Sequence, residues 1–167
     1  MKIKSMALGT MFTKSYIISD SHNNAYIIDP GADGEKVLSF LNKESLNLKF
    51  IINTHGHFDH IGANEFLKQK TAAEIIIHKK DSELLTDPAK NLSGYFYSSR
   101  KITSPPADKF IADGDILEFD EFKFKVIHTP GHTAGGVSFY CSGEKILFSG
   151  DTIFSNGIGR TDLPGAD

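Results

Sequence analysis

The chain has 167 residues, about the size of one domain, and is long enough to bury a core without disulfides or structural metals. Hydrophobic residues make up 40% and charged residues 23%, which excludes a disordered chain, and the net charge of −3 lacks the basic footprint of a nucleic-acid partner. Its single cysteine, Cys141, excludes an internal disulfide. No apolar run approaches a membrane span, and the first residues are too polar for a signal peptide. We therefore expect a cytoplasmic globular protein without a nucleic-acid or membrane partner, and the sequence leaves its oligomeric state open.

The first elements in chain order are two short strands and a helix. Residues 15–19 and 25–29 are β-branched and aromatic, with turn-forming residues 20–24 between them, which predicts a β-hairpin. Asp33 is a candidate N-cap for the helix that follows. The apolar residues of this helix fall on one face: Val37, Leu38, Phe40 and Leu41.

Strands and helices then alternate along the chain. Residues 49–53 and 74–78 are brief apolar runs typical of buried strands. Residues 62–70 predict a helix between them, and residues 79–86 predict a short helix after the second strand. This alternation predicts a mixed sheet with helices on the outside.

The middle of the chain, residues 87–115, has no hydrophobic period. A loop of this length inside a compact domain is usually functional or mobile. It contains two tyrosines, Tyr95 and Tyr97. They either line a substrate pocket or pack together as a satellite hydrophobic cluster.

Strands resume in the last third of the chain. Residues 121–128 alternate between apolar side chains and lysine, which predicts a half-buried strand. Residues 136–141 and 145–149 predict a hairpin, and residues 151–167 predict a glycine-rich loop. Cys141 lies within a predicted strand and is expected to be a buried structural thiol.

Three histidines and one aspartate lie within six residues: His55, His57, Asp59 and His60. They directly follow the predicted strand 49–53, which is a rigid base for a site. Imidazole and carboxylate are ligands of Zn²⁺ and of non-haem iron. The segment therefore predicts a metal site.

Two further loops each contribute one candidate ligand after a predicted strand. His132 follows the strand 121–128, and Asp151 follows the strand 145–149. Ligands of catalytic metals commonly lie on loops that a rigid scaffold holds at one end of a sheet. We expect these two side chains to converge on the 55–60 segment.

The motifs THGHFDH, PGHTAGG and FSGDTIF, in this order and after IIDPG, resemble the successive motifs of the metallo-β-lactamase-fold hydrolases. The run GIGRTDLPG is similar to the branch that contains glyoxalase II-like (hydroxyacylglutathione hydrolase-type) thioesterases and persulfide dioxygenases. The resemblance covers the whole chain. It implies an α/β fold, a four-layer αββα sandwich, with the metals at one edge between the two sheets.

The resemblance also implies roles by position. His55, His57 and His132 correspond to the ligands of a first metal, Asp59 and His60 to those of a second, and Asp151 to the ligand shared by both. The family places one more histidine of the second site on a later loop, beyond Asp167. We therefore expect residues 1–167 to form a single domain that lacks its C-terminal strands and helix, so that the second half of the sandwich is incomplete.

This resemblance implies a metal-dependent thioesterase that hydrolyses a small-molecule thioester. Two Zn²⁺ ions would lower the pKa of a shared water, and Asp59 would orient the resulting hydroxide toward the thioester carbonyl. Mixed zinc and iron is an alternative metal content. A persulfide dioxygenase would instead hold one Fe²⁺ on His55, His132 and Asp151. A third alternative is a fragment that binds metal without catalysis.

Three further residues are expected to support the site. The resemblance places Asp29 where it would orient a ligand-bearing loop, although the same residue would also suit a turn before the helix. Thr54 is expected to act in the same way. The Arg160 side chain would contact a substrate carboxylate or pair with an acid such as Asp162.

Overall fold

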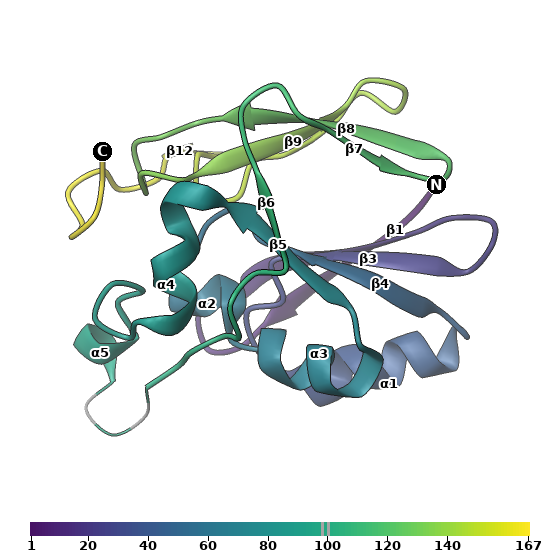
Figure 1. The fold of residues 1–167 in the computed structure, drawn as a ribbon, viewed down its shortest axis with the longest axis horizontal. Helices are drawn as coiled ribbons and strands as arrows, with labels where there is room; N and C mark the ends of the chain where they lie inside the picture. Colours follow the sequence, from purple (N-terminus) through teal and green to yellow (C-terminus); the bar gives the residue numbers. More distant parts are fainter. Residues whose placement is uncertain (98, 100) are drawn as a thin grey trace.

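The computed structural model describes residues 1–97, 99 and 101–167, and its main feature is a pair of stacked β-sheets (Figure 1). The larger sheet has the strand order β1-β2-β3-β4-β5-β6. Strands β1, β2 and β3 are antiparallel neighbours, whereas β3, β4, β5 and β6 run parallel. The bounds are β1 (Lys2–Leu8), β2 (Thr13–Ser19), β3 (Asn24–Ile28), β4 (Asn47–Ile52), β5 (Glu74–His78) and β6 (Lys109–Ile111).

The smaller sheet is antiparallel with the order β10-β9-β8-β7, and a separate two-stranded ribbon joins β11 to β12. The bounds are β7 (Ile116–Phe119), β8 (Phe122–His128), β9 (Val137–Cys141), β10 (Ile146–Phe148), β11 (Ile153–Phe154) and β12 (Gly157–Ile158).

Helices α1 (Gly34–Lys43) and α3 (Asn64–Thr71) lie against the face of the larger sheet that is turned away from the smaller one (Figure 1). The short helical segments lie nearer the sheet edge: α2 (Phe58–Ile61), η1 (Lys79–Asp81), α4 (Ser82–Thr86) and α5 (Ser93–Phe96). No helix of the described residues covers the outer face of the smaller sheet (Figure 1). The helix layer and the two sheet layers are thus three of the four layers of the expected sandwich. Among the described residues, no helix is long and apolar enough to span a lipid bilayer.

Two hydrophobic cores occupy the two faces of the larger sheet, because successive side chains of a strand point to opposite faces. On the strands β2, β4 and β5, Ile17, Ile51 and Ile75 pack toward the helices. Their neighbours Ile18, Ile52 and Ile76 pack toward the smaller sheet. The smaller sheet contributes large apolar side chains to this second core: Phe119, Phe122, Phe124, Val126, Val137, Phe139 and Phe148.

Most of the predicted elements are present. The hairpin of residues 15–29 corresponds to β2 and β3, and the strand 74–78 coincides with β5. The predicted helix 62–70 corresponds to α3, and a separate turn of helix, α2, precedes it. The hairpin of residues 136–149 corresponds to β9 and β10. Cys141 is buried, as expected.

The region 87–115 was expected to be a loop, and this is wrong in part. It contains the short helix α5 and the strand β6, which extends the larger sheet beside β5. Positions 98 and 100 of this region lie outside the described residues. The strand escaped prediction because three residues are too few to show a period.

Candidate metal centre

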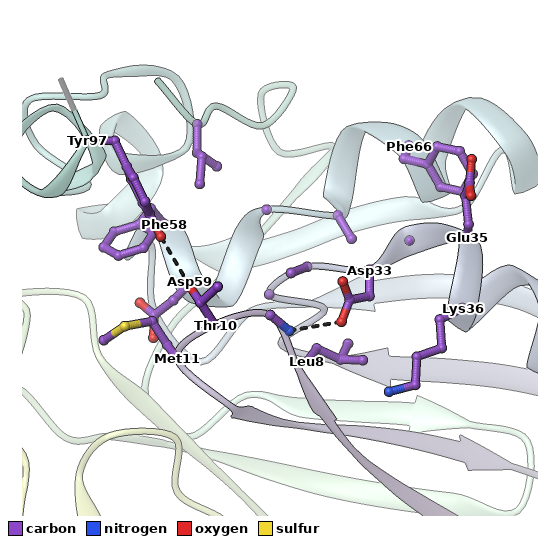
Figure 2. Close-up of a pocket in the computed structure, with 17 residues that line it drawn as sticks. Leu8, Thr10, Met11, Asp33, Glu35, Lys36, Phe58, Asp59, Phe66 and Tyr97 are labelled. Carbon is purple, nitrogen blue, oxygen red and sulfur yellow. Dashed lines mark hydrogen bonds between the residues drawn. The ribbon is translucent and has the colours of Figure 1, made fainter. Parts of the chain in front are cut away.

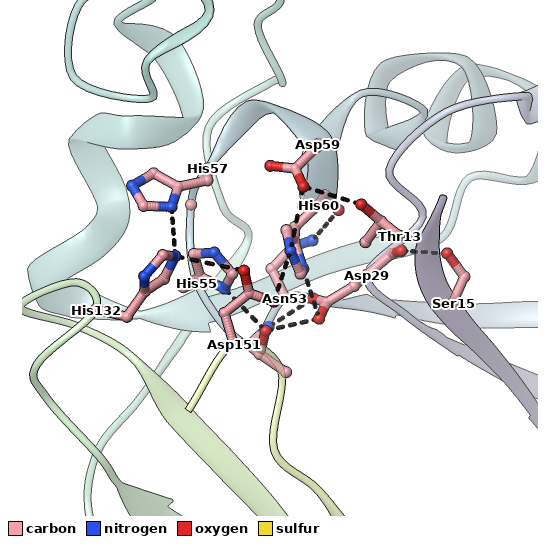
Figure 3. Close-up of polar contacts among 12 residues, drawn as sticks. Thr13, Ser15, Asp29, Asn53, His55, His57, Asp59, His60, His132 and Asp151 are labelled. Carbon is pink, nitrogen blue, oxygen red and sulfur yellow. Dashed lines mark hydrogen bonds and ion pairs between the residues drawn. The ribbon is translucent and has the colours of Figure 1, made fainter. Parts of the chain in front are cut away.

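The segment that follows β4 places three histidines at the edge between the two sheets (Figure 3). His55, His57 and His60 are 2%, 4% and 3% exposed, respectively. The buried Asn53 amide donates to the main-chain carbonyl of His60 at 3.0 Å, which closes the loop between β4 and α2. The loop is thus anchored at both ends, and its imidazoles are held inside the protein.

The loops after β8 and β10 bring His132 and Asp151 to the same point (Figure 3). Nε2 of His132 lies 2.9 Å from Nδ1 of His57 and 3.5 Å from Oδ2 of Asp151. The other carboxylate oxygen of Asp151 lies 3.3 Å from Nε2 of His60. The structure therefore brings the predicted residues of three separate loops together.

Two groups of ligand atoms, each within 4.8 Å of one another, are found among the described residues. One consists of His55, His57 and His132, and the other of His55, His60 and Asp151. Asp59 belongs to neither group, although its Oδ2 lies 3.6 Å from Nε2 of His60. That oxygen accepts a hydrogen bond from the Thr13 hydroxyl at 2.9 Å, which holds the Asp59 carboxylate beside the groups.

The outer nitrogens of the imidazoles face oxygen atoms of the protein. Nδ1 of His132 donates to the main-chain carbonyl of Arg160 at 2.8 Å, so its Nε2 is unprotonated in the neutral ring. Nδ1 of His60 lies 3.0 Å from Oδ2 of Asp29, and Nδ1 of His55 lies 3.1 Å from the Thr54 hydroxyl. Such contacts on one ring nitrogen leave the other free for a metal.

The environment of His55 provides a test of whether a cation fits. Its Nε2 is buried and has no hydrogen-bond partner among the described residues, although buried polar atoms are nearly always paired. Ring nitrogens of His57 and His132 also lie close to each other in this cluster, and the Asp151 carboxylate lies beside His132. Imidazole and carboxylate donors facing one another suit zinc or iron, so these residues fit such an ion.

The surroundings favour the neutral form of His55 and His57 and the protonated form of His60. Burial and the neighbouring imidazoles hold the pKa of His55 well below its usual value and lower the pKa of His57 to about 3. Burial also opposes charge on His60, but Asp29 and Asp151 outweigh it and raise the pKa of His60 well above the usual value. Neutral imidazoles are the form that binds metal.

Asp29 and Thr54 connect the ligand loop to the end of β3. The Asp29 carboxylate accepts hydrogen bonds from the Thr54 amide at 2.7 Å and from its hydroxyl at 2.6 Å. The Arg160 side chain lies at the surface, where Nε and an outer guanidinium nitrogen donate to Asp162 at 2.8 and 2.9 Å. Of the two alternatives for this side chain, the structure therefore has the ion pair.

Sequence reasoning missed three contributors near the site. The Thr13 hydroxyl, the Arg160 carbonyl and the buried carboxylate of Asp81 all contact the ligands or their loops. Nothing in the sequence pattern indicates these contacts, because each joins distant segments. His128 stacks on His78 with ring centroids 4.6 Å apart, and its Nε2 lies 2.9 Å from the Ala134 carbonyl.

A cavity of about 870 Å³ lies beside Asp59 (Figure 2). Its walls come from the turn between β1 and β2, from the N-terminal end of α1, and from Phe58 and Tyr97. The Tyr97 hydroxyl lies 3.4 Å from that of Thr10, across the cavity's edge. Tyr97 thus lines a cavity, whereas Tyr95 is exposed and packs against Phe96. The volume is in the range of small-molecule pockets.

Comparisons with a family model and with known proteins point to one family. The sequence model of the metallo-beta-lactamase superfamily matches residues 8–167. The chain is 37% identical to the hydroxyacylglutathione hydrolase GloC of Haemophilus influenzae, over 90% of this chain and 71% of that protein. It is 35% identical to the probable metallo-hydrolase YqgX of Bacillus subtilis, over 100% of this chain and 78% of that protein.

Solved structures share the fold. The BLEG-1 B3 metallo-beta-lactamase superposes with a TM-score of 0.94 at 40% identity, over 99% of this chain and 79% of that chain. TTHA1623, in a di-iron-bound form, gives 0.85 at 30% identity over 98% and 79% of the two chains. ETHE1 from Myxococcus xanthus gives 0.74 at 25% identity over 100% and 64%. From its fold, its clustered ligands and these matches, the chain belongs to the metallo-beta-lactamase superfamily.

Proposed function

We propose that the protein is a metal-dependent thioesterase of the hydroxyacylglutathione hydrolase type. One observation carries the proposal: five side chains from three loops form two groups that could hold metal at one sheet edge, and one of them, His55, has a buried nitrogen without a partner among the described residues. The named activity of GloC at 37% identity supports the choice of a thioester as substrate.

In this proposal two cations share the cluster. His55, His57 and His132 would hold the first, Asp59 and His60 the second, and Asp151 both. The further histidine that the family resemblance implies for the second site stays a prediction. Bound zinc or iron would supply a water of lowered pKa and an electrophile for the carbonyl oxygen.

The chain's own residues would orient the reactants. The Thr13 hydroxyl donates to Oδ2 of Asp59, the oxygen that lies 3.6 Å from Nε2 of His60, and so would hold this carboxylate where it can orient the attacking water. The cavity beside Asp59 is large enough for part of a small-molecule thioester. The lone cysteine, Cys141, is buried on β9, so we assign it no role as a nucleophile.

Two other reactions remain candidates because of specific likenesses. The match to the BLEG-1 B3 metallo-beta-lactamase favours hydrolysis of a β-lactam amide. The resemblance of the GIGRTDLPG run to persulfide dioxygenases, together with the proximity of His55, His132 and Asp151, favours a single-iron dioxygenase. The three reactions differ in substrate, in metal count and in the use of oxygen.

The test is to measure the metal content of the purified protein and its turnover of three substrates. These are S-lactoylglutathione, a chromogenic cephalosporin, and glutathione persulfide with recording of oxygen consumption. We expect two metals per chain, hydrolysis of the thioester, and loss of that activity in chelator with recovery on added zinc. Thioester turnover that persists after complete metal removal would contradict the proposal, and one iron with oxygen consumption would favour the dioxygenase.

A further inference from the structure

Asp81 is a fully buried carboxylate that no part of the proposed chemistry uses. It ends the 3₁₀ turn η1 after β5 and is 0% exposed. Its Oδ2 accepts hydrogen bonds from the Gly56 amide at 3.0 Å and from the Thr133 hydroxyl at 2.7 Å. Its Oδ1 accepts from the Gly135 amide at 2.6 Å. All three donors come from other segments of the chain.

These donors lie on the two loops that supply the first group of histidines. Gly56 stands between His55 and His57, and Thr133 directly follows His132. One carboxylate therefore joins the loop after β4 to the loop after β8. The bonds span 25, 52 and 54 residues of sequence.

The two loops lie so close to Asp81 and the start of α4 that a side chain at Gly135 or Gly56 would not fit. A Cβ on Gly135 would lie 2.5 Å from Oδ1 of Asp81, and a Cβ on Gly56 would lie 2.4 Å from Cβ of Leu84. At contacts under 3.0 Å, the added Cβ or the neighbouring atoms would have to move. The amides of both glycines thus reach the carboxylate because these positions lack side chains.

We propose that Asp81 is a positioning residue that holds His55 and His57 against His132 so that they bind one cation together. This inference rests on the proposed function, since it requires that the cluster binds metal. A carboxylate suits the task because its two oxygens can accept three hydrogen bonds. Asparagine has one acceptor oxygen, and its amide would face a donor of one of the two loops.

The test compares zinc affinity in two matched variants, measured on metal-free protein by competition with a chromophoric chelator. Asp81→Asn should weaken zinc binding about 10- to 100-fold, as losses of contacts around metal ligands do. The control is Asp20→Asn in the β2–β3 turn. Asp20 is also a buried carboxylate, and it accepts hydrogen bonds from the amides of His22 and Asn24. It contacts no ligand loop, so this variant should keep the zinc affinity of the unaltered protein.

A second pair of variants decides the matter if Asp81→Asn does not fold. Thr133→Val removes one hydroxyl donor and should weaken zinc binding roughly three- to ten-fold, whereas Thr133→Ser keeps the donor and should restore it. Unchanged affinity in Asp81→Asn or Thr133→Val, or equal weakening in Asp20→Asn, would overturn the role of Asp81. Failure of the unaltered protein to bind zinc would instead overturn the proposed function.

Discussion

At the scale of single residues, the carboxylate of Asp29 organises much of the second ligand group. Asp29 has a left-handed backbone conformation with φ 52°, and its carboxylate accepts two hydrogen bonds from Thr54. Its Oδ2 also lies 3.0 Å from Nδ1 of His60. A partner on the outer nitrogen fixes the orientation of an imidazole and so directs its other nitrogen at the metal.

We therefore predict that Asp29→Asn weakens zinc binding about 10- to 100-fold. The amide has one acceptor oxygen in place of two and no charge to pair with His60. Asp33→Asn is the matched control. Asp33 lies with Asp29 on the connection between β3 and α1, and it accepts a hydrogen bond from the Gly9 amide but from none of the candidate ligands. Isothermal titration of metal-free protein with zinc measures the difference. Equal affinities in the two variants would show that Asp29 does not position His60.

The contact of Arg160 with His132 uses its main-chain carbonyl, so its side chain is expected to be dispensable for metal binding. We predict that Arg160→Ala changes zinc affinity by less than about two-fold, because an exposed ion pair such as that with Asp162 contributes little. The same titration checks this. A rise in KM at unchanged zinc affinity would assign the side chain to substrate binding, and a large loss of zinc would contradict the prediction.

At the scale of elements, the site depends on loops that approach one another without side chains between them. A Cβ on Gly31, before α1, would lie 1.7 Å from the Asp59 carbonyl. Gly150 has φ +50°, and a Cβ there would lie 2.3 Å from the Thr54 hydroxyl oxygen. Asp151 is the next residue, so the placement of this shared candidate ligand depends on how near Gly150 lies to Thr54.

We predict that Gly150→Ala lowers both stability and zinc affinity. The left-handed conformation costs an L-residue roughly 1–2 kcal/mol, and the added methyl would push the Asp151 loop away from Thr54. Gly143→Ala is the control, because it lies in the β9–β10 turn with nothing within 4 Å of the added Cβ. Thermal unfolding with and without zinc measures both effects. If both variants behave alike, the close approach at Gly150 is unimportant.

At the scale of the whole molecule, the candidate centre joins parts that are otherwise held by separate contacts. The larger sheet supplies the 55–60 segment, and the smaller sheet supplies the loops of His132 and Asp151. A cation bound by both would favour the folded state over the unfolded one, in which the ligands are dispersed.

Metal removal is therefore predicted to lower the melting temperature. At a free zinc concentration 100 times Kd, binding adds about 2.7 kcal/mol, which corresponds to roughly 5–10 °C for a chain of this size. Scanning calorimetry before and after dialysis against chelator measures the shift, and zinc added back should reverse it. A melting temperature that does not respond to chelator would contradict binding across the two sheets.

The elements that could be predicted are those whose burial is written into a local pattern. Residues 75–77 are three consecutive isoleucines because helices and the smaller sheet cover both faces of β5. Residues 122–128 alternate because one face of β8 is exposed. In contrast, β1 was not predicted. It is an edge strand whose first residues are exposed, and its lysines leave no apolar period.

The sequence by itself determined the family and the candidate ligands, because the ordered motifs of imidazole and carboxylate residues can be recognised without knowing how the loops meet. Only the tertiary structure decided which groups orient them. The Arg160 carbonyl, the Thr13 hydroxyl and the Asp81 carboxylate lie 28, 46 and up to 54 residues from their partners. Such contacts arise from the packing of whole sheets and loops, so no local spacing or composition records them.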